Sequence, residues 1–180
     1  MGIDIYARWN GQTRRERKAQ QTGFSTVHGH VGYLREAYHG GPYVTRFLVR
    51  EAFEADDCEA GIPASTLKTR LPQAVILAMI RHQMVYNDNV PHMLNAEKPE
   101  EVIAAIAKMF AAGGEIEKAR KGEEGDRLAR SISLGVIKET VDRIASRTLP
   151  EFAMSFVDFV TLCERKEAET GEPCRIYASY

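Results

Sequence analysis

The sequence GIDIYARW, residues 2–9, decides the fold class of this 180-residue chain. Every second side chain in it is apolar: Ile3, Ile5, Ala7 and Trp9. This period of two is typical of a β-strand that buries one face, and the turn-forming dipeptide Asn10-Gly11 ends it. The amino terminus is therefore predicted to be a half-buried strand.

Two other stretches alternate in the same way. CRIYASY, residues 174–180, closes the chain, and YVTRFLVR, residues 43–50, follows Pro42. A strand with one apolar face needs neighbouring strands and a covering layer. We therefore expect an α+β fold in which the two terminal strands and residues 43–50 form a small antiparallel sheet, covered by about four helices.

Much of the remaining sequence carries the signals of helices. Thr13 and Glu16 have the spacing of a capping box, which predicts a short polar helix after Thr13. Pro72 suits a first helical turn and predicts the start of a long apolar helix that ends near residue 86. Further helices are predicted between residues 99 and 144 from the spacing of their apolar side chains.

The last predicted helix carries an aromatic stripe. A second capping box, Thr148 with Glu151, is expected to open this helix, and Gly171 is suited to end it. Four side chains recur at helical spacing: Phe152, Phe156, Phe159 and Cys163. A stripe of this kind is typical of a helix face turned to the interior, so we expect it to form part of the hydrophobic core.

The composition is that of one ordinary globular domain, residues 1–180. Apolar residues make up 44% and charged residues 27%, with a net charge of −1. This balance gives the molecule no overall electrostatic reason to bind nucleic acid or an acidic membrane, and neither is expected. The charge is uneven, because residues 1–50 hold eight Lys and Arg against three Asp and Glu. This basic portion could face an anion or dock on the acidic remainder, and the sequence leaves both open.

The cysteines and the amino terminus bear on localisation. Cys58, Cys163 and Cys174 show neither a CxxC pair nor metal-ligand spacing, and their odd number suits free thiols in a reducing compartment. The amino terminus has neither the basic region nor the apolar run of a signal peptide. The longest apolar run, residues 74–80, is too short to span a membrane. We therefore expect a cytoplasmic protein.

Residues 22–43 are the strongest candidate for a binding site. Seven of the 14 glycines, three of the five histidines and four of the seven tyrosines lie within the first 43 residues. Glycines let the backbone approach a ligand closely, and imidazoles titrate near neutral pH and bind metals. We expect one polar pocket here, whose candidate binding residues are His28, Gly29, His30, Gly32, Tyr33, Arg35, Glu36, Tyr38 and His39.

A metal is one ligand for such a pocket, with His28, His30, Glu36 and His39 as candidate metal ligands. The two histidines of the HGH triplet, His28 and His30, would point to one side of an extended segment. Glu36 and His39 would share one face of a helix. If residues 31–38 form the two helical turns that their pattern predicts, however, His30 and His39 are about 13 Å apart. A mononuclear site with three histidines therefore requires that helix to be absent.

An anion such as phosphate is a second ligand for the pocket. Gly29 and Gly32 stand at the start of the helix predicted over residues 31–38, where free backbone N–H groups and the helix dipole favour negative charge. Arginines would add charge-assisted hydrogen bonds: Arg8, Arg35 and Arg46. The glycine spacing matches neither a P-loop nor GxGxxG, so the sequence predicts an anion site without naming its ligand.

Two other interpretations stay open. The histidines and tyrosines of residues 22–43 could serve only to satisfy buried backbone groups. The function could also be non-catalytic, with the helical carboxy-terminal half forming a homo-oligomer or a surface for another partner. No motif specific to one reaction is present, so the sequence does not decide whether the protein is an enzyme, and it names no cofactor.

The opening GIDIYARW, taken together with VHGHVGYLREAYHGG at residues 27–41, resembles a family of small bacterial and phage-type proteins. The resemblance covers mainly residues 1–50. It implies no activity, no cofactor and no catalytic residue.

Overall fold

The structure, a computed structural model, describes residues 2–21, 28–37, 43–86, 130 and 132–180. Its central feature is a four-stranded sheet, made of β1 (Gly2–Arg8), β2 (Tyr33–Ala37), β3 (Glu59–Gly61) and β4 (Arg175–Ser179). The order across the sheet is β2-β1-β4-β3, and each neighbouring pair is antiparallel. The two terminal strands therefore pair at its centre, which confirms them both and confirms the α+β fold class.

The strand register separates the side chains into two faces. Residues directly opposite each other in neighbouring strands share a face, and Ile5 is opposite both Leu34 of β2 and Ala178 of β4. These three side chains are buried in the core, on what we call the inner face. Tyr6 is opposite Tyr33 on the other side of the sheet, which we call the outer face.

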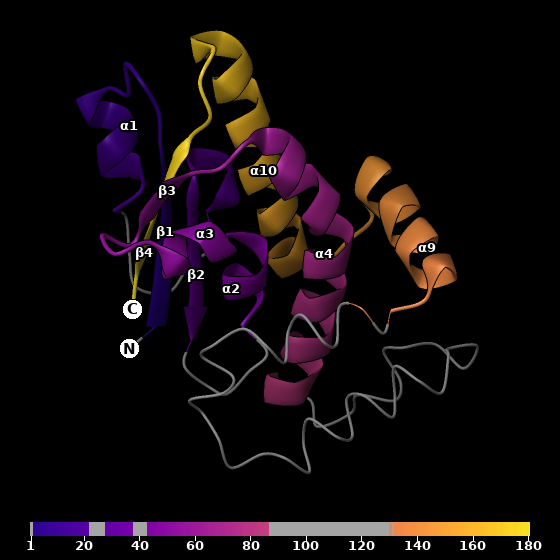
Figure 1. The fold of residues 1–180 in the computed structure, drawn as a ribbon. Helices are drawn as coiled ribbons and strands as arrows, with labels where there is room; N and C mark the ends of the chain where they lie inside the picture. The colour runs from indigo at the N-terminus through magenta and orange to yellow at the C-terminus, as the bar shows by residue number, and fades with distance from the viewer. Residues whose placement is uncertain (1, 22–27, 38–42, 87–129, 131) are drawn as a thin grey trace.

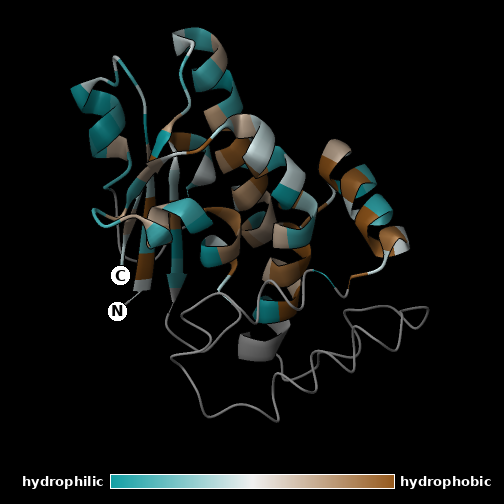
Figure 2. Ribbon diagram, in the orientation of Figure 1, coloured by the Kyte–Doolittle hydropathy of each residue, from teal (hydrophilic) through white to brown (hydrophobic). Residues whose placement is uncertain are grey.

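The helices that the structure describes are α1 (Arg14–Ala19), α2 (Val44–Leu48), α3 (Arg50–Glu54), α4 (Ala64–Tyr86), α9 (Leu134–Ala145) and α10 (Glu151–Thr170), and η1 (Gly29–Val31) is a 3-10 turn. Helices α2, α3, α4 and α10 lie on the inner side of the sheet, α9 lies beyond α4, and α1 buries none of its residues (Figure 1). α10 packs on α4 and η1, and α9 packs on α4. Figure 2 shows hydrophobic residues along β1, α4 and α10, whereas α1 is mostly hydrophilic. The inner face and the buried sides of α2, α3, α4 and α10 form one core.

The predictions for α1 and for the aromatic stripe are confirmed. α1 opens with a capping box, because the Glu16 N–H donates to Thr13 Oγ1 (3.2 Å) and the Thr13 N–H donates to the Glu16 carboxylate (2.7 Å). The stripe on α10 lies in or against the core, with Phe156, Phe159 and Cys163 buried and Phe152 half-buried. Gly171 ends α10 in the left-handed conformation, with φ 75°.

The start of α10 differs from the prediction. Its N-cap is Pro150, and no side chain caps the helix, so the capping box of Thr148 and Glu151 is wrong. The Thr148 hydroxyl lies 3.1 Å from the hydroxyl of Ser146 instead. Pro150 replaces a side-chain cap by fixing its own φ at −58°, which directs the chain into the helix.

The start of α4 also differs. The helix begins at Ala64 and continues through Pro72, so Pro72 does not open it. The Ala64 N–H donates to the carboxylate of Glu167 on α10 (2.6 Å). This contact satisfies a first-turn donor from a distant part of the chain, and local sequence does not reveal it.

α9 confirms the later part of the helical pattern predicted between residues 99 and 144. Residues 99–129 lie outside the part of the chain that the structure describes. None of the helices that it does describe is long and apolar enough to cross a membrane.

Residues 43–50, predicted as a strand, form α2 and the start of α3 instead. The N–H groups of Val44 and Thr45 donate to the Glu36 carboxylate (2.9 and 3.0 Å), which gives the first turn of α2 the acceptors that a helix start needs. Apolar side chains are buried at consecutive positions over residues 47–49. Such a segment fills a core as a helix or as a strand, so its alternation did not discriminate between them.

Of residues 31–38, predicted as two helical turns, Tyr33–Ala37 form strand β2 instead, Val31 ends η1, and residue 38 lies outside the described residues. The strand pairs with β1, which satisfies its backbone N–H and C=O groups and buries Leu34 completely. The period of two places Leu34 and Glu36 on the inner face, and Tyr33 and Arg35 on the outer face.

Candidate functional site

The predicted binding residues of the 22–43 segment are distributed over η1 and β2. His28 precedes η1 and is half-buried, and His30 is exposed within η1. Their rings lie edge to face, with centroids 5.7 Å apart. The structure therefore brings these two histidines together. Tyr38 and His39 lie outside the described residues.

Gly29 and Gly32 serve packing and backbone geometry. A Cβ at Gly29 would lie 1.8 Å from the Ser155 carbonyl oxygen, so η1 packs on α10 at a distance that only glycine permits. Gly32 follows η1 with φ 81°. The N–H groups of Val31 and Gly32 donate to the carbonyls of His28 and Gly29 (3.0 and 2.8 Å). These N–H groups are therefore not free for the anion predicted at this position.

Tyr33 and Arg35 lie on the outer face, where both contact Asp4 of β1. The Tyr33 hydroxyl donates to the Asp4 carboxylate (2.6 Å), and Arg35 Nη1 lies 3.4 Å from the same oxygen. Burial and this hydrogen bond raise the pKa of the Tyr33 hydroxyl well above its usual value. The hydrogen bond with Tyr33 raises the pKa of the Arg35 guanidinium. Tyr33 is therefore neutral and Arg35 cationic near neutral pH, and Asp4 compensates the charge of Arg35.

Glu36 lies on the inner face and is 6% exposed. Its carboxylate accepts from the N–H groups of Val44 and Thr45, from the Thr45 hydroxyl (2.6 Å) and from Arg81 Nη1 (2.9 Å). These donors occupy both carboxylate oxygens, so the carboxylate is not available to a metal. We call Glu36, Thr45 and Arg81 the Glu36 cluster; it joins β2 to α2 and α4.

Arg35 and Glu36 are therefore on opposite sides of the sheet. The structure therefore does not place these two residues in the single polar pocket that the sequence led us to expect. Within the described ranges, no group of three or more His, Cys, Asp or Glu side chains is placed to hold one metal ion. Ligand binding by His28 and His30 stays a prediction.

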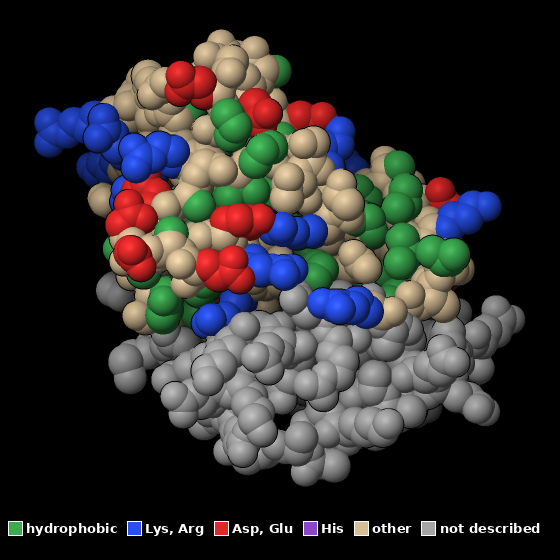
Figure 3. All heavy atoms as spheres, in the orientation of Figure 1, with side chains coloured by type: hydrophobic (Ala, Val, Ile, Leu, Met, Phe, Trp, Pro, Cys, Tyr) green, Lys and Arg blue, Asp and Glu red, His purple; other side chains and the backbone are tan. Residues whose placement is uncertain are grey.

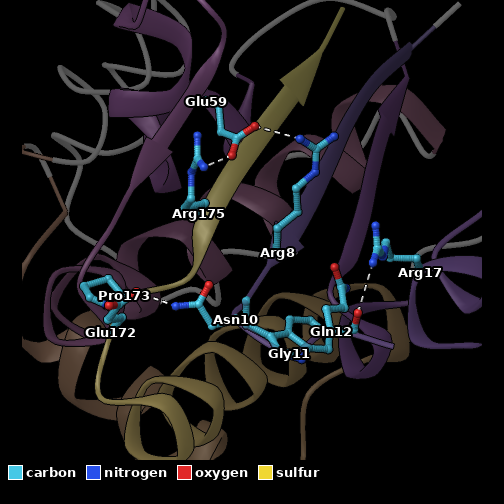
Figure 4. A pocket seen from close by; sticks show the side chains of 10 residues that line it. Arg8, Asn10, Gly11, Gln12, Arg17, Glu59, Glu172, Pro173 and Arg175 are labelled. Atoms are coloured by element: carbon cyan, nitrogen blue, oxygen red, sulfur yellow. Dashed lines mark hydrogen bonds and ion pairs between the residues drawn. The ribbon is translucent and has the colours of Figure 1, made fainter. Parts of the chain in front are cut away.

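A different pocket opens where β1 ends (Figure 4). Its volume is about 570 Å³, which lies within the range of small-molecule sites in proteins. It is lined by the turn of residues 9–12, by Pro173 and by five charged side chains: Arg8, Arg17, Glu59, Glu172 and Arg175. Cationic groups therefore outnumber anionic ones around it.

Glu59 holds two of these arginines. Its side chain is 12% exposed, and its two carboxylate oxygens each lie 2.7 Å from a guanidinium nitrogen, Arg8 Nη1 and Arg175 Nε. Figure 4 shows the carboxylate between the two guanidinium groups. Arg8 also lies over the ring of Tyr177, 4.4 Å from its centroid. We call Arg8, Glu59 and Arg175 the Glu59 cluster.

The Glu59 cluster retains hydrogen-bond donors and positive charge. A guanidinium carries five N–H donors, and Glu59 engages one nitrogen of each arginine. One carboxylate compensates only one of the two guanidinium charges. The side chains of Arg8 and Arg175 are 47% and 67% exposed, so their remaining donors are accessible from the pocket.

Two connections bring the pocket residues to one place. The chain turns after β1, where the Gln12 N–H donates to the Trp9 carbonyl (3.2 Å) and Gly11 has φ 74°. The Asn10 amide of this turn donates to the Glu172 carboxylate (2.7 Å). This hydrogen bond joins the turn to the connection between α10 and β4.

A strained residue positions Glu59. Cys58, which precedes it, has φ 56°, a conformation that residues other than glycine rarely adopt. The Cys58 carbonyl accepts from the Ala178 N–H (2.9 Å), and the Cys58 N–H donates to the Ala55 carbonyl (3.0 Å). These bonds hold the turn that starts β3 and places Glu59 opposite Tyr177. Backbone strain of this kind is enriched at functional sites.

Arg8 is among the predicted anion contacts, whereas Glu59 and Arg175 are not. The three residues are distant in sequence and meet because β4 pairs with both β1 and β3. A signal for Arg175 was present, because Arg8 and Arg175 both occupy outward positions in terminal strands that were expected to pair. Glu59 gave no such signal, since it ends an acidic stretch with the composition of a solvated loop.

No family model, no curated protein and no solved structure matches this chain. Its function is therefore inferred from the geometry of the pocket.

Proposed function

We propose that this protein binds a small anionic molecule in the pocket where β1 ends. The ligand carries a phosphate or a carboxylate group, which the guanidinium groups of Arg8 and Arg175 bind.

The Glu59 cluster is the observation that carries this proposal. Guanidinium groups bind phosphate and carboxylate through paired N–H donors. Arg8 and Arg175 are directly opposite each other in neighbouring strands, so the backbone fixes their spacing. The contacts with Glu59 restrict both side chains before a ligand arrives, which lowers the entropic cost of binding.

Inorganic phosphate is the first probe, because it offers several acceptor oxygens to two guanidinium groups. Trp9 is the single tryptophan of the protein and lines the pocket, so its fluorescence reports binding there. We expect a saturable fluorescence change with added phosphate. Isothermal titration calorimetry is expected to give one site.

Substitution of either arginine tests the assignment of the binding residues. Arg8→Ala and Arg175→Ala are each expected to weaken phosphate binding by about tenfold or more, because a hydrogen bond to a charged group contributes about 1.5–3 kcal/mol. Arg165→Ala is the matched control. Arg165 is an exposed arginine of α10 whose Nε lies 3.8 Å from the Glu169 carboxylate, and it does not line the pocket. Wild-type phosphate affinity in the folded Arg8→Ala, Arg175→Ala double variant would refute the proposal.

A second candidate function is a partner surface on α9. Leu134 and Val141 are large hydrophobic side chains that are 85% and 44% exposed. They lie seven residues apart, two turns of the helix, and therefore share one face of α9. Figure 3 shows hydrophobic side chains gathered over α9.

A second copy of the chain is the simplest occupant of this stripe. Analytical ultracentrifugation tests this self-association. A wild type that forms an oligomer, together with a Leu134→Ser variant that is monomeric, would support a partner surface on α9. A wild type that is monomeric at every concentration refutes self-association.

A further inference from the structure

A third arginine lines the pocket from a different element. Arg17 belongs to α1, and its Nη2 donates to the carbonyl of Gln12 (3.2 Å). Figure 4 shows Arg17 well apart from Arg175, with Arg8 and Gln12 between them. The pocket therefore has two cationic centres, the Glu59 cluster and Arg17.

The two centres differ in how far their charge is compensated. Arg8 and Arg175 share the carboxylate of Glu59. Arg17 forms no ion pair in the part of the chain that the structure describes, and its hydrogen bond goes to an uncharged carbonyl. Arg17 therefore brings a full positive charge to the pocket. That charge favours an anionic group of the ligand at this second position as well.

The space at the pocket suits a ligand larger than one inorganic anion. Its volume is about 570 Å³. The turn of residues 9–12, which follows β1, lines it on one side. The body of a ligand can therefore lie along this turn, between the two cationic centres.

We infer that the ligand carries two anionic groups, one bound by Arg8 and Arg175 and the other by Arg17. The inference rests on the proposed function, since it concerns the same pocket. Bisphosphates and dicarboxylates share this chemistry, and the experiment below separates them.

Calorimetric titrations compare anions in two pairs, phosphate with pyrophosphate and acetate with succinate. The wild type is expected to bind the doubly anionic member of at least one pair about tenfold more tightly, because its second group is held at a high effective concentration near Arg17. The pair with the larger gain identifies the ligand class as phosphate or carboxylate.

Substitutions on α1 test the role of Arg17. Arg17→Ala is expected to remove the preference for two anionic groups, so that the variant binds the singly and doubly anionic members of each pair with similar affinity, because Arg8 and Arg175 are intact. Arg14→Ala is the matched control, since Arg14 is an exposed arginine of the same helix and does not line the pocket. Arg17→Lys retains the charge and is expected to keep part of the preference.

The outcomes separate the two proposals. Loss of the preference in Arg17→Ala but not in Arg14→Ala supports the inference. No preference in the wild type, or the same preference in Arg17→Ala, overturns it and leaves the proposed function standing. If none of the four anions binds the wild type, the proposed function itself fails.

Discussion

Glu36 and Glu59 both contact arginines, and they do so on opposite faces of the sheet. Glu36 lies on the inner face and meets Arg81 of α4. Glu59 lies on the outer face and meets Arg8 and Arg175 at the edge of the pocket. The chemical groups are the same in both clusters, whereas the surroundings are not.

Burial and stoichiometry decide what each cluster can do. In the Glu36 cluster one carboxylate receives four donors, and the side chains of Arg81 and Glu36 are 9% and 5% exposed. In the Glu59 cluster one carboxylate faces two exposed guanidinium groups. A saturated acceptor holds elements together, and an excess of exposed donors is available to a ligand. We therefore assign a stabilising role to the first cluster and propose ligand binding for the second.

Loss of the Glu36 carboxylate is expected to cause the largest loss of stability. Glu36→Ala leaves Arg81 buried without its carboxylate and removes the acceptors of the first turn of α2. Breaking a buried ion pair in this way costs about 3–5 kcal/mol of unfolding free energy. Urea denaturation of the variant and the wild type measures it.

Glu59→Ala is the matched control on the outer face. The arginine partners of Glu59 are largely exposed. Exposed ion pairs contribute about 0–1 kcal/mol to the free energy of unfolding. A loss of stability as large as that of Glu36→Ala would contradict the division between the two clusters.

A smaller loss of stability is expected from Gly29→Ala, at the place where η1 packs closely on α10. In Gly29→Ala the added Cβ would lie 1.8 Å from the Ser155 carbonyl, so η1 must move away from α10. Overpacking of this kind costs about 1–3 kcal/mol. Gly61→Ala in β3 is the control, since its Cβ would meet no atom within 4 Å, and we expect it to change the thermal midpoint little. Equal midpoints for the two variants would show that η1 does not pack as described.

The pair of Glu51 and Arg70 is partly exposed, and its loss is expected to reduce stability only a little. Arg70 donates to both carboxylate oxygens of Glu51 (2.8 and 2.6 Å), and the Glu51 side chain is 39% exposed. These hydrogen bonds lower the pKa of Glu51 below its ordinary value of 4.5. The ionised form is thus favoured in the folded state, and its contribution is present above pH 4.5 and lost as the pH falls through the lowered pKa.

The Glu51→Gln variant measures this contribution. Because solvent screens a pair of this exposure, we expect a loss of about 1 kcal/mol or less at neutral pH. The difference from the wild type is expected to shrink in urea titrations as the pH falls below the ordinary pKa of Glu51. A difference that is constant with pH would show that the ion pair is not its source.

The sequence predicted the elements whose signals are local. The alternation in GIDIYARW and in the carboxy-terminal segment identified the two central strands, and the spacing of the α10 stripe identified a core helix. Each of these patterns records one buried face, which an element needs wherever it lies in the fold. The failures at residues 31–38 and 43–50 both arise from contacts that lie outside each segment. Tyr33–Ala37 pairs with β1, and Glu36 of β2 supplies acceptors to the first turn of α2.

The candidate site was harder to predict for the same reason. The composition of residues 22–43 predicted a binding site there. In the structure, however, Gly29 allows η1 to pack on α10, and Glu36 belongs to the Glu36 cluster. The pocket assembles Arg8, Glu59 and Arg175 from three strands. The expected pairing of the terminal strands could have brought Arg8 and Arg175 together, whereas Glu59 joins them only because β3 pairs with β4.

The location of bound phosphate on the molecule tests the central claim most directly. A 1H–15N NMR titration of the full chain with phosphate follows the backbone amides and the side-chain signals of Trp9 and the arginines. We predict shift changes concentrated at residues 8–12, at Arg17 and Glu59 and at residues 172–175, which line the pocket. Changes concentrated at residues 28–36 instead, or no change at saturating phosphate, would contradict the assignment of binding to the Glu59 cluster.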